Sequence, residues 1–301
     1  MATPGSARMT LDYHVVDVFT ETPLQGNGLA VVFDTVGLSA ELMQAIAGEF
    51  NLSETTFISR RDRETELREG VRVRIFTTQE ELPFAGHPTL GTASVLRLVA
   101  PETLDDDTLR LALNVGTVPV RFRPDRLFGE MTQRDPEFGE KLDPTEVARC
   151  TGLRIEDLHA STPPQVVSTG TAFAIVVLRS HEPLARLRVD HERATPYLRQ
   201  HGGRWFYVMG STLTGNSAWR ARMQFYGGED PATGSAAGCA ISYLVGHGIV
   251  PPQYQIHVQQ GVEIDRASDL FLTANIVSGK VVSVRVAGST VPVAKGQLFL
   301  P

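Results

Sequence analysis

Three polar side chains stand in sequence settings that favour chemistry. His87 lies between a glycine and a proline in ELPFAGHPTLGTA, directly before a run of small residues. Glu54 opens the otherwise uncharged segment ETTFI, where burial would disfavour its charged form, as suits a group that both takes and gives a proton. Asp230 lies in GGEDPATGSAAG, five residues before Ser235. Together they indicate proton transfer as the chemistry to test.

Each of these residues also has an ordinary structural explanation. Glu54 fits a solvated carboxylate at a strand end or a cap, and Asp230 fits a turn residue before proline or an N-cap. Glu229, beside Asp230, is ambiguous in the same way. His87 fits a structural histidine bonded to a backbone carbonyl. The residue types and their spacing leave these alternatives open.

Two segments of small residues have a similar design. FAGHPTLGTASVL and PATGSAAGCAISYL each lead through a glycine, Gly86 or Gly234, into a predicted helix, and they lie 148 positions apart. A helix N-terminus presents unpaired N–H groups and partial positive charge, so each start is a candidate site for a carboxylate. We interpret the pair as two similar halves whose anion sites open on one cleft.

Several other functions lack their motifs. GNGLAV has no third glycine and joins two predicted strands, TGSAA lacks the GxSxG pattern, and neither a P-loop nor HExxH occurs. Without clustered His, Cys and Asp ligands, we expect no metal. The net charge is -6 with interspersed signs, and no apolar run is long enough to span a bilayer. We therefore expect neither nucleic acid nor a membrane as partner. Two distant cysteines, Cys150 and Cys239, favour a reducing cytoplasm.

The predicted elements must position these groups. After a predicted disordered tail over residues 1–10, short strands dominate, including residues 13–19, 29–34, 54–60 and 71–77. Helices are predicted from Ser39 as N-cap to about Asn51, over residues 88–99, near 144–150, over 190–199, and after Gly234. This order argues against a βαβ repeat and for mostly antiparallel sheets that each wrap a helix. We predict one domain from residues 11–118 with about 289–301, and a second from 119–288.

The sequence resembles the phenazine biosynthesis PhzF-like family. The matching motifs are VDVFTETPLQGNGLAVVFD, NLSETTFI, RIFTTQEELPFAGHPTLGTA, RARMQF, GGEDPATGSAAG and QGVEIDR, in the family's order, whereas residues 125–205 match weakly. The resemblance implies an α+β fold like that of diaminopimelate epimerase, with two pseudo-symmetric domains, each a β-barrel around a central helix. It also implies an active site between the domains, no cofactor, and a homodimer.

The same resemblance assigns roles to individual residues. It implies Glu54 as the catalytic acid/base and a small carboxylate-bearing substrate, held by His87, Asp230, Ser235, Thr233 and the backbone N–H groups of Gly86 and Gly234. The family's best-understood activity is isomerisation of trans-2,3-dihydro-3-hydroxyanthranilate.

Relatives of the fold that racemise amino acids carry two cysteines, where this sequence has Ala85 and Thr233. Neither side chain can act as a thiolate base. Departures from the family, such as Gly28 and Ala267 where proline is usual, flank the substrate end and leave the substrate open. The leading hypothesis is a cofactor-independent isomerase. A non-catalytic binding or scaffold protein, and an amino-acid epimerase without cysteines, remain alternatives.

Overall fold

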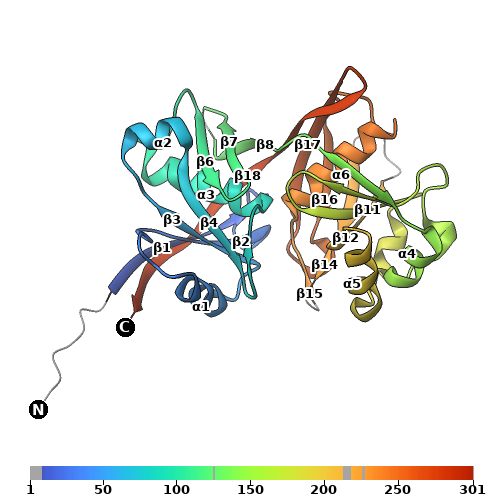
Figure 1. Cartoon of the computed structure of the whole chain (residues 1–301), viewed down its shortest axis with the longest axis horizontal. Coiled ribbons are helices and arrows are strands. Elements are labelled where there is room, and N and C mark those ends of the chain that lie inside the picture. Colours follow the sequence, from blue (N-terminus) through green and yellow to red (C-terminus); the bar gives the residue numbers. More distant parts are fainter. Residues whose placement is uncertain (1–8, 125, 213–217, 226–227, 301) are drawn as a thin grey trace, which may run out of the picture.

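The computed structural model describes residues 9–124, 126–212, 218–225 and 228–300. The chain forms two lobes side by side, joined by strands that run from one into the other (Figure 1). Within the described residues, the α-helices are α1 (Ala40–Phe50), α2 (Arg63–Glu69), α3 (Gly86–Val99), α4 (Pro144–Thr151), α5 (His191–Gln200) and α6 (Gly234–Gly246).

The first lobe is a closed barrel. Its strands follow the order β1 (Met9–Val18), β2 (Asn27–Val32), β3 (Glu54–Ser59), β4 (Val71–Thr77), β6 (Thr108–Leu113), β7 (Gly116–Phe122), β8 (Phe128–Thr132) and β18 (Lys280–Leu300), with the short β5 (Glu81–Leu82) beside β4. The far end of β18 pairs back onto β1, from Thr290 opposite Val18 to Leu300 opposite Met9, and so closes the ladder.

The second lobe continues from the same strand. From β18 the order is β17 (Ser268–Val277), β16 (Ile256–Gln260), β13 (Ala218–Arg222), β12 (Trp205–Ser211), β11 (Ala172–Leu178), β10 (Gln165–Ser168) and β9 (Glu137–Lys141). A separate ribbon joins β14 (Gln224–Phe225) and β15 (Gly228–Glu229). No ladder joins β9 to β18 in the described residues, so this barrel is open at one seam.

Each sheet wraps one buried helix. In α3 every residue from Gly86 to Leu96 is buried, and in α6 every residue from Gly234 to Val245. Small residues allow this close fit: a Cβ at Gly91 would lie 2.6 Å from Leu29 Cδ2 of β2. The polar side chains of α3 find partners, since the Ser94 hydroxyl donates to the Leu90 carbonyl. The predicted α+β fold with two similar halves is confirmed.

Local signals account for several element ends. Ser39 Oγ accepts from the Leu42 N–H at the start of α1, and Asn51 ends that helix in the left-handed region, as predicted. The structure also contains α2, which the sequence analysis did not predict. Asp62 caps α2, and Arg60 and Arg61 pair with acidic side chains on it.

The division of the chain differs in detail from the predicted ranges. The predicted boundary after residue 118 falls inside β7, and the strands of the closed barrel continue to Thr132. Met9 and Thr10, predicted as tail, begin β1, while residues 1–8 lie outside the described residues.

Candidate active site

The two buried helices meet at their N-termini. An added Cβ at Gly86 would lie 2.4 Å from both the Gly234 carbonyl carbon and the Ser235 nitrogen. The two backbones are therefore in contact, and glycine is required at Gly86 for this approach. Both partial positive helix ends consequently point into one region between the lobes. The anion sites predicted from the two glycine-led segments lie side by side, with Ser235 buried in the first turn of α6.

Glu54 reaches this region as the first residue of β3. Its backbone lies between Leu29 of β2 and Thr77 of β4, and the residue is 9% exposed. Burial raises the pKa of Glu54 well above its ordinary value, and the nearby charge of Asp230 raises it further. Glu54 Oε2 is buried with no hydrogen-bond partner among the described residues. A solvated strand-end carboxylate would have neither property, so a proton-transfer role fits better.

His87 faces Glu54 from the first turn of α3. The two side chains approach to 3.5 Å between His87 Nε2 and Glu54 Oε2, beyond an ordinary hydrogen bond, and His87 Nε2 has no partner in the described part of the chain. The other ring nitrogen, Nδ1, lies 3.1 Å from the amide nitrogen of Asn27. Burial lowers the pKa of His87 to about 3, so the ring is neutral. The alternative of a bond to a backbone carbonyl is not what the structure shows.

Asp230 forms the opposite wall, in the loop before α6. It is 4% exposed and accepts hydrogen bonds from Thr233 Oγ1 at 2.6 Å, Asn27 Nδ2 at 2.7 Å and Ser53 Oγ at 3.3 Å. Burial raises the pKa of Asp230, although these donors oppose the rise. The N-cap position of α6 is Thr233, so Asp230 is not the cap. A carboxylate held this firmly is a fixed partner for a donor group on a substrate.

Other polar groups hold the loop before α6 in place. Gln260 Nε2 donates to the Asp230 carbonyl at 2.8 Å and to Thr233 Oγ1 at 2.9 Å. The neighbouring Glu229 is paired with Arg222, whose guanidinium also donates to the Leu184 carbonyl. Glu229 is therefore a structural residue, which resolves its ambiguity in the sequence.

The sequence analysis missed Asn27, Ser53 and Gln260 as parts of this site. Asn27 stands in the GNG turn, where the sequence analysis rejected a dinucleotide loop and noted only Gly28 as a departure from the family. The sequence feature that could have pointed to Asn27 is an amide side chain at the start of a valine-rich strand. A polar side chain buried there needs hydrogen-bond partners. Those partners lie more than 200 positions away at Asp230 and Ala232, and no local pattern reveals them.

Ala85 and Thr233, where the resemblance places the cysteines of racemases of the fold, are the N-cap residues of the two buried helices. Cys239 lies deeper in α6, where burial raises the pKa of its thiol to about 11. Neither helix start therefore offers a thiolate. Among the described residues, no group of three or more His, Cys, Asp and Glu side chains is arranged to hold a metal ion. No helix in the described ranges is long and apolar enough to cross a membrane.

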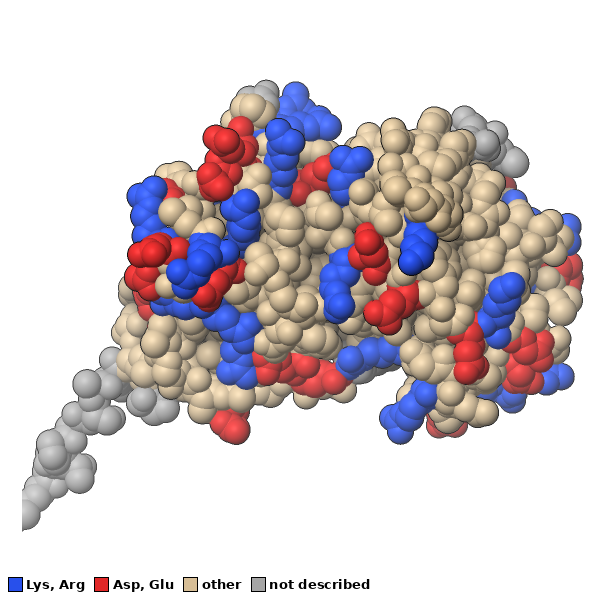
Figure 2. All heavy atoms as spheres, turned by 45° about the horizontal axis from the view of Figure 1, so that its top comes forward, with Lys and Arg blue, Asp and Glu red and all other residues tan. Residues whose placement is uncertain are grey.

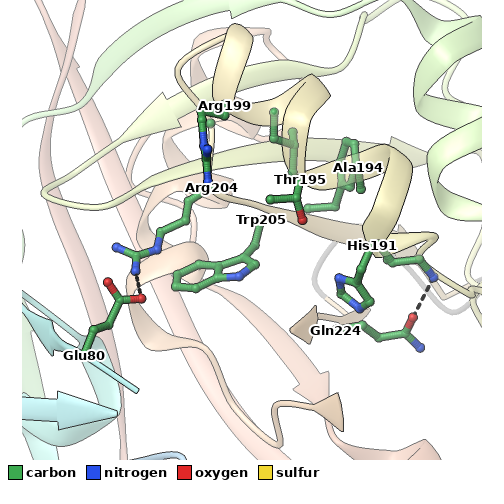
Figure 3. Close-up of a pocket in the computed structure, with 12 residues that line it drawn as sticks. Glu80, His191, Ala194, Thr195, Arg199, Arg204, Trp205 and Gln224 are labelled. Carbon is green, nitrogen blue, oxygen red and sulfur yellow. Dashed lines mark hydrogen bonds and ion pairs between the residues drawn. The ribbon is translucent and has the colours of Figure 1, made fainter. Parts of the chain in front are cut away.

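The candidate site is largely buried in this structure. The pocket shown in Figure 3 lies elsewhere on the boundary between the lobes, between Glu80 near β5 and the residues of α5, with Trp205 in its wall. An ion pair between Glu80 and Arg204 joins the two lobes at its edge (Figure 3). Glu54, His87 and Asp230 are all buried, so little of the candidate site is open to solvent. On the face shown in Figure 2, acidic and basic side chains are interspersed.

Comparison with known proteins places this geometry in a family. The sequence profile described as phenazine biosynthesis-like protein matches residues 16–296. The chain is 37% identical over 296 residues to the trans-2,3-dihydro-3-hydroxyanthranilate isomerase of Pseudomonas aeruginosa, with 96% of this chain and 99% of that protein aligned.

Solved structures agree with the sequence comparison. A predicted epimerase from Pseudomonas aeruginosa superposes with a TM-score of 0.79 at 32% identity, covering 95% of this chain and 98% of that one. A PhzF-family protein from Bacillus anthracis superposes with a TM-score of 0.81 at 25% identity, covering 96% and 99%. The chain therefore belongs to the phenazine biosynthesis-like protein family and is an isomerase of that family.

Proposed function

We propose that the protein is a cofactor-independent isomerase that moves one proton between two carbons of a small carboxylate-bearing substrate, with Glu54 as the acid/base. The observation that carries the proposal is the buried, unbonded Oε2 of Glu54 beside His87 Nε2. Burial raises the pKa of Glu54 by disfavouring its charged form, which suits a group that both takes and gives a proton.

Glu54 alone is sufficient for the proton shift, because it takes one proton and returns one proton. Glu54 takes a proton as a C–H bond breaks, and the electron pair passes into the conjugated system of the substrate. The same carboxylic acid then returns the proton to another carbon on the same face, so the substrate and product are isomers and the enzyme is unchanged.

Neighbouring groups stabilise the charge that develops on the substrate. The N–H groups at the starts of α3 and α6, next to Gly86 and Gly234, suit a substrate carboxylate, since both partial positive ends lie there. Thr233 holds Asp230, which suits a donor group such as an amine or hydroxyl. Ser235 and His87 complete the polar wall that holds the substrate.

The candidate substrate comes from a relative. The similar Pseudomonas aeruginosa protein is a trans-2,3-dihydro-3-hydroxyanthranilate isomerase, and its substrate carries a carboxylate on a conjugated ring. We propose a substrate of this class for the present chain.

Solvent isotope incorporation tests both parts of the proposal. Wild type is incubated with trans-2,3-dihydro-3-hydroxyanthranilate in D₂O, and the product is examined for carbon-bound deuterium by mass spectrometry. Glu54→Gln keeps the shape of the side chain and removes the base, so turnover should fall by about 10²-fold to 10⁴-fold. Glu41→Gln, on the exposed first turn of α1, is the matched control.

The outcomes separate the hypotheses. Wild-type-like turnover by Glu54→Gln would reject the role of Glu54, and no turnover by wild type would reject this substrate. Thermal stabilisation by the ligand without proton exchange would instead favour a binding protein. Loss of optical rotation from an amino acid would favour an epimerase. The proposed homodimer is tested separately by light scattering, which should give twice the 32.8 kDa of one chain.

A further inference from the structure

The side chain of Asn27 joins both walls of the site. Its amide nitrogen lies 2.7 Å from Asp230 Oδ1, 2.9 Å from the Ala232 carbonyl oxygen and 3.1 Å from His87 Nδ1. Asn27 is 1% exposed, and the acceptors come from both lobes. The amide nitrogen only donates, with two protons shared among three neighbouring atoms. Each of these atoms must therefore present a lone pair to it.

The Ala232 carbonyl fixes the orientation of this amide. A carbonyl oxygen carries no proton, so only the nitrogen of Asn27 can face it with a favourable contact. The reversed amide would place Asn27 Oδ1 against this oxygen and against an Asp230 carboxylate oxygen. The amide nitrogen, with its protons, therefore points at Ala232, Asp230 and His87.

The orientation of Asn27 determines which ring nitrogen of His87 is protonated. A proton on His87 Nδ1 would collide with the amide protons of Asn27, so Nδ1 carries the lone pair. The ring is neutral because it is fully buried without an acidic hydrogen-bond partner. The single ring N–H must then be on Nε2, the atom that faces Glu54 Oε2 at 3.5 Å.

We propose that Asn27 is a positioning residue that holds His87 as its Nε2–H tautomer, which makes His87 a hydrogen-bond donor into the site and leaves Glu54 as the base. Its catalytic consequence rests on the function proposed above, whereas the tautomer itself is a property of the protein without substrate. Nε2 and Oε2 have no hydrogen-bond partner in the described part of the chain, so both are available to a substrate atom that lies beside them within reach of each.

Nitrogen NMR reads the tautomer directly. In ¹⁵N-labelled wild-type protein without substrate, the ring nitrogens of His87 are correlated with their carbon-bound protons. We expect the Nδ1 resonance of a non-protonated nitrogen and the Nε2 resonance of a protonated one. His87→Gln identifies the His87 signals among the eight histidines of the chain. Protonated Nδ1 in wild type would overturn the proposal without any variant.

Two substitutions separate positioning from structural support. Asn27→Asp places an oxygen where the amide nitrogen lies, so His87 should move its proton to Nδ1, and kcat should fall by about 10²-fold or more. Ser53→Ala removes a different donor from Asp230 and does not touch His87 Nδ1, so the tautomer should remain Nε2–H. Circular dichroism of each variant confirms folding.

The results distinguish this proposal from the function it deepens. An unchanged His87 tautomer in folded Asn27→Asp rejects the positioning role. A changed tautomer with unchanged kcat on a turned-over substrate rejects its catalytic consequence. If wild type shows the Nε2–H tautomer but no proton exchange with the substrate, the proposed substrate fails while the positioning role stands.

Discussion

The two halves of the molecule share one connectivity but close their sheets differently. Six strands of the first half have counterparts in the second half in the same order: β1 matches β10, β2 matches β11, β3 matches β12, β4 matches β13, β6 matches β16 and β7 matches β17. The parallel pairs β2–β3 and β4–β6 recur as β11–β12 and β13–β16. In the first half, Pro292 of β18 lies at a bulge opposite Val16, and the ladder continues to Leu300. In the second, the chain between β8 and β9 contains Pro136, and the described ladder stops there. The two halves thus share one strand connectivity, but the first forms a closed barrel and the second an open one.

The halves differ equally in their chemistry. Glu54 begins β3 opposite Leu29 of β2, and the matching place in the second half is Trp205, which begins β12 opposite Phe173 of β11. The second half supplies Asp230 from a loop instead. Both halves share one topology, whereas Glu54, the proposed acid/base, belongs to one half. The candidate active site is therefore asymmetric even though the helices that frame it are equivalent.

The largest expected effect is a difference in stability between substitutions at Gly86 and Gly234, the first residues of the two buried helices. Gly86→Ala would place Cβ 2.4 Å from backbone atoms of Gly234 and Ser235, which cannot rotate away. At Gly234, an added Cβ would lie 3.0 Å from Phe19 Cζ, 3.1 Å from Met131 Cε and 3.1 Å from the backbone Cα of Gly86, so these neighbours need to give by only a few tenths of an ångström. Urea unfolding should show a loss of about 3 kcal/mol or more for Gly86→Ala and about 1 kcal/mol for Gly234→Ala. Equal losses would contradict this reading of the helix contact.

The second prediction concerns the carboxylate that only the first half carries. Because the folded-state pKa of Glu54 is raised, its stabilising contribution is complete below the unfolded pKa of about 4.3 and is lost as the pH rises through the folded pKa. Glu54→Gln avoids this loss. It should be more stable than wild type at about pH 8, by about 1.4 kcal/mol per unit of pKa shift, and equally stable at about pH 4. Urea unfolding at both pH values measures the difference, and a pH-independent gain would show that the charge is not responsible.

The third prediction compares equivalent serines in the two buried helices. Ser94 of α3 bonds to Thr290 Oγ1 of the closing strand at 3.0 Å, while Ser242 of α6 donates within its own helix to the Gly238 carbonyl. Ser94→Ala should cost about 1 kcal/mol because Thr290 is left in a dry environment without this partner. Ser242→Ala should cost about half of that or less. Thermal unfolding of the pair measures the difference, and the reverse order would show that Ser94 does not support barrel closure.

The smallest effect requires no substitution. β9 forms only a short ladder with β10, whereas Thr290 to Leu300 of β18 pair with β1 over its full length, with one bulge at Pro292. Hydrogen exchange followed by mass spectrometry should therefore be faster in β9 than in this part of β18. Equal protection would indicate that the seam is closed in solution.

The sequence predicted those features that depend on local patterns. The N-cap Ser39 and the end of α1 near Asn51 were predicted because both residues act on their own helix. The short α2 was missed because it contains one large apolar residue, Leu67, and depends on ion pairs made by its neighbours. The open seam was missed because it depends on which strands pair in the folded chain. Pro292 in β18 and Pro136 before β9 give no sequence signal that only the first strand closes a barrel.

The site shows the same division. Glu54 and His87 were chosen as polar residues in apolar segments, and Asp230 for its place just before the second small-residue helix. The structure brings all three together. Asn27 was missed because its three acceptors are distributed over both lobes. Chemistry-bearing residues can be recognised one by one, but the residue that orients them is defined only by the assembled fold.

The long strand β18 also bears on how the chain is made. It is synthesised after every other described strand, yet it pairs with β1, β8 and β17. Until β18 leaves the ribosome, β1 has an unpaired edge and the sheets of both halves lack this strand. Completion of both sheets therefore depends on one late segment. Such a chain gains its native pairing in a single late step, and its nascent form must be kept from associating through the edge that β18 will cover.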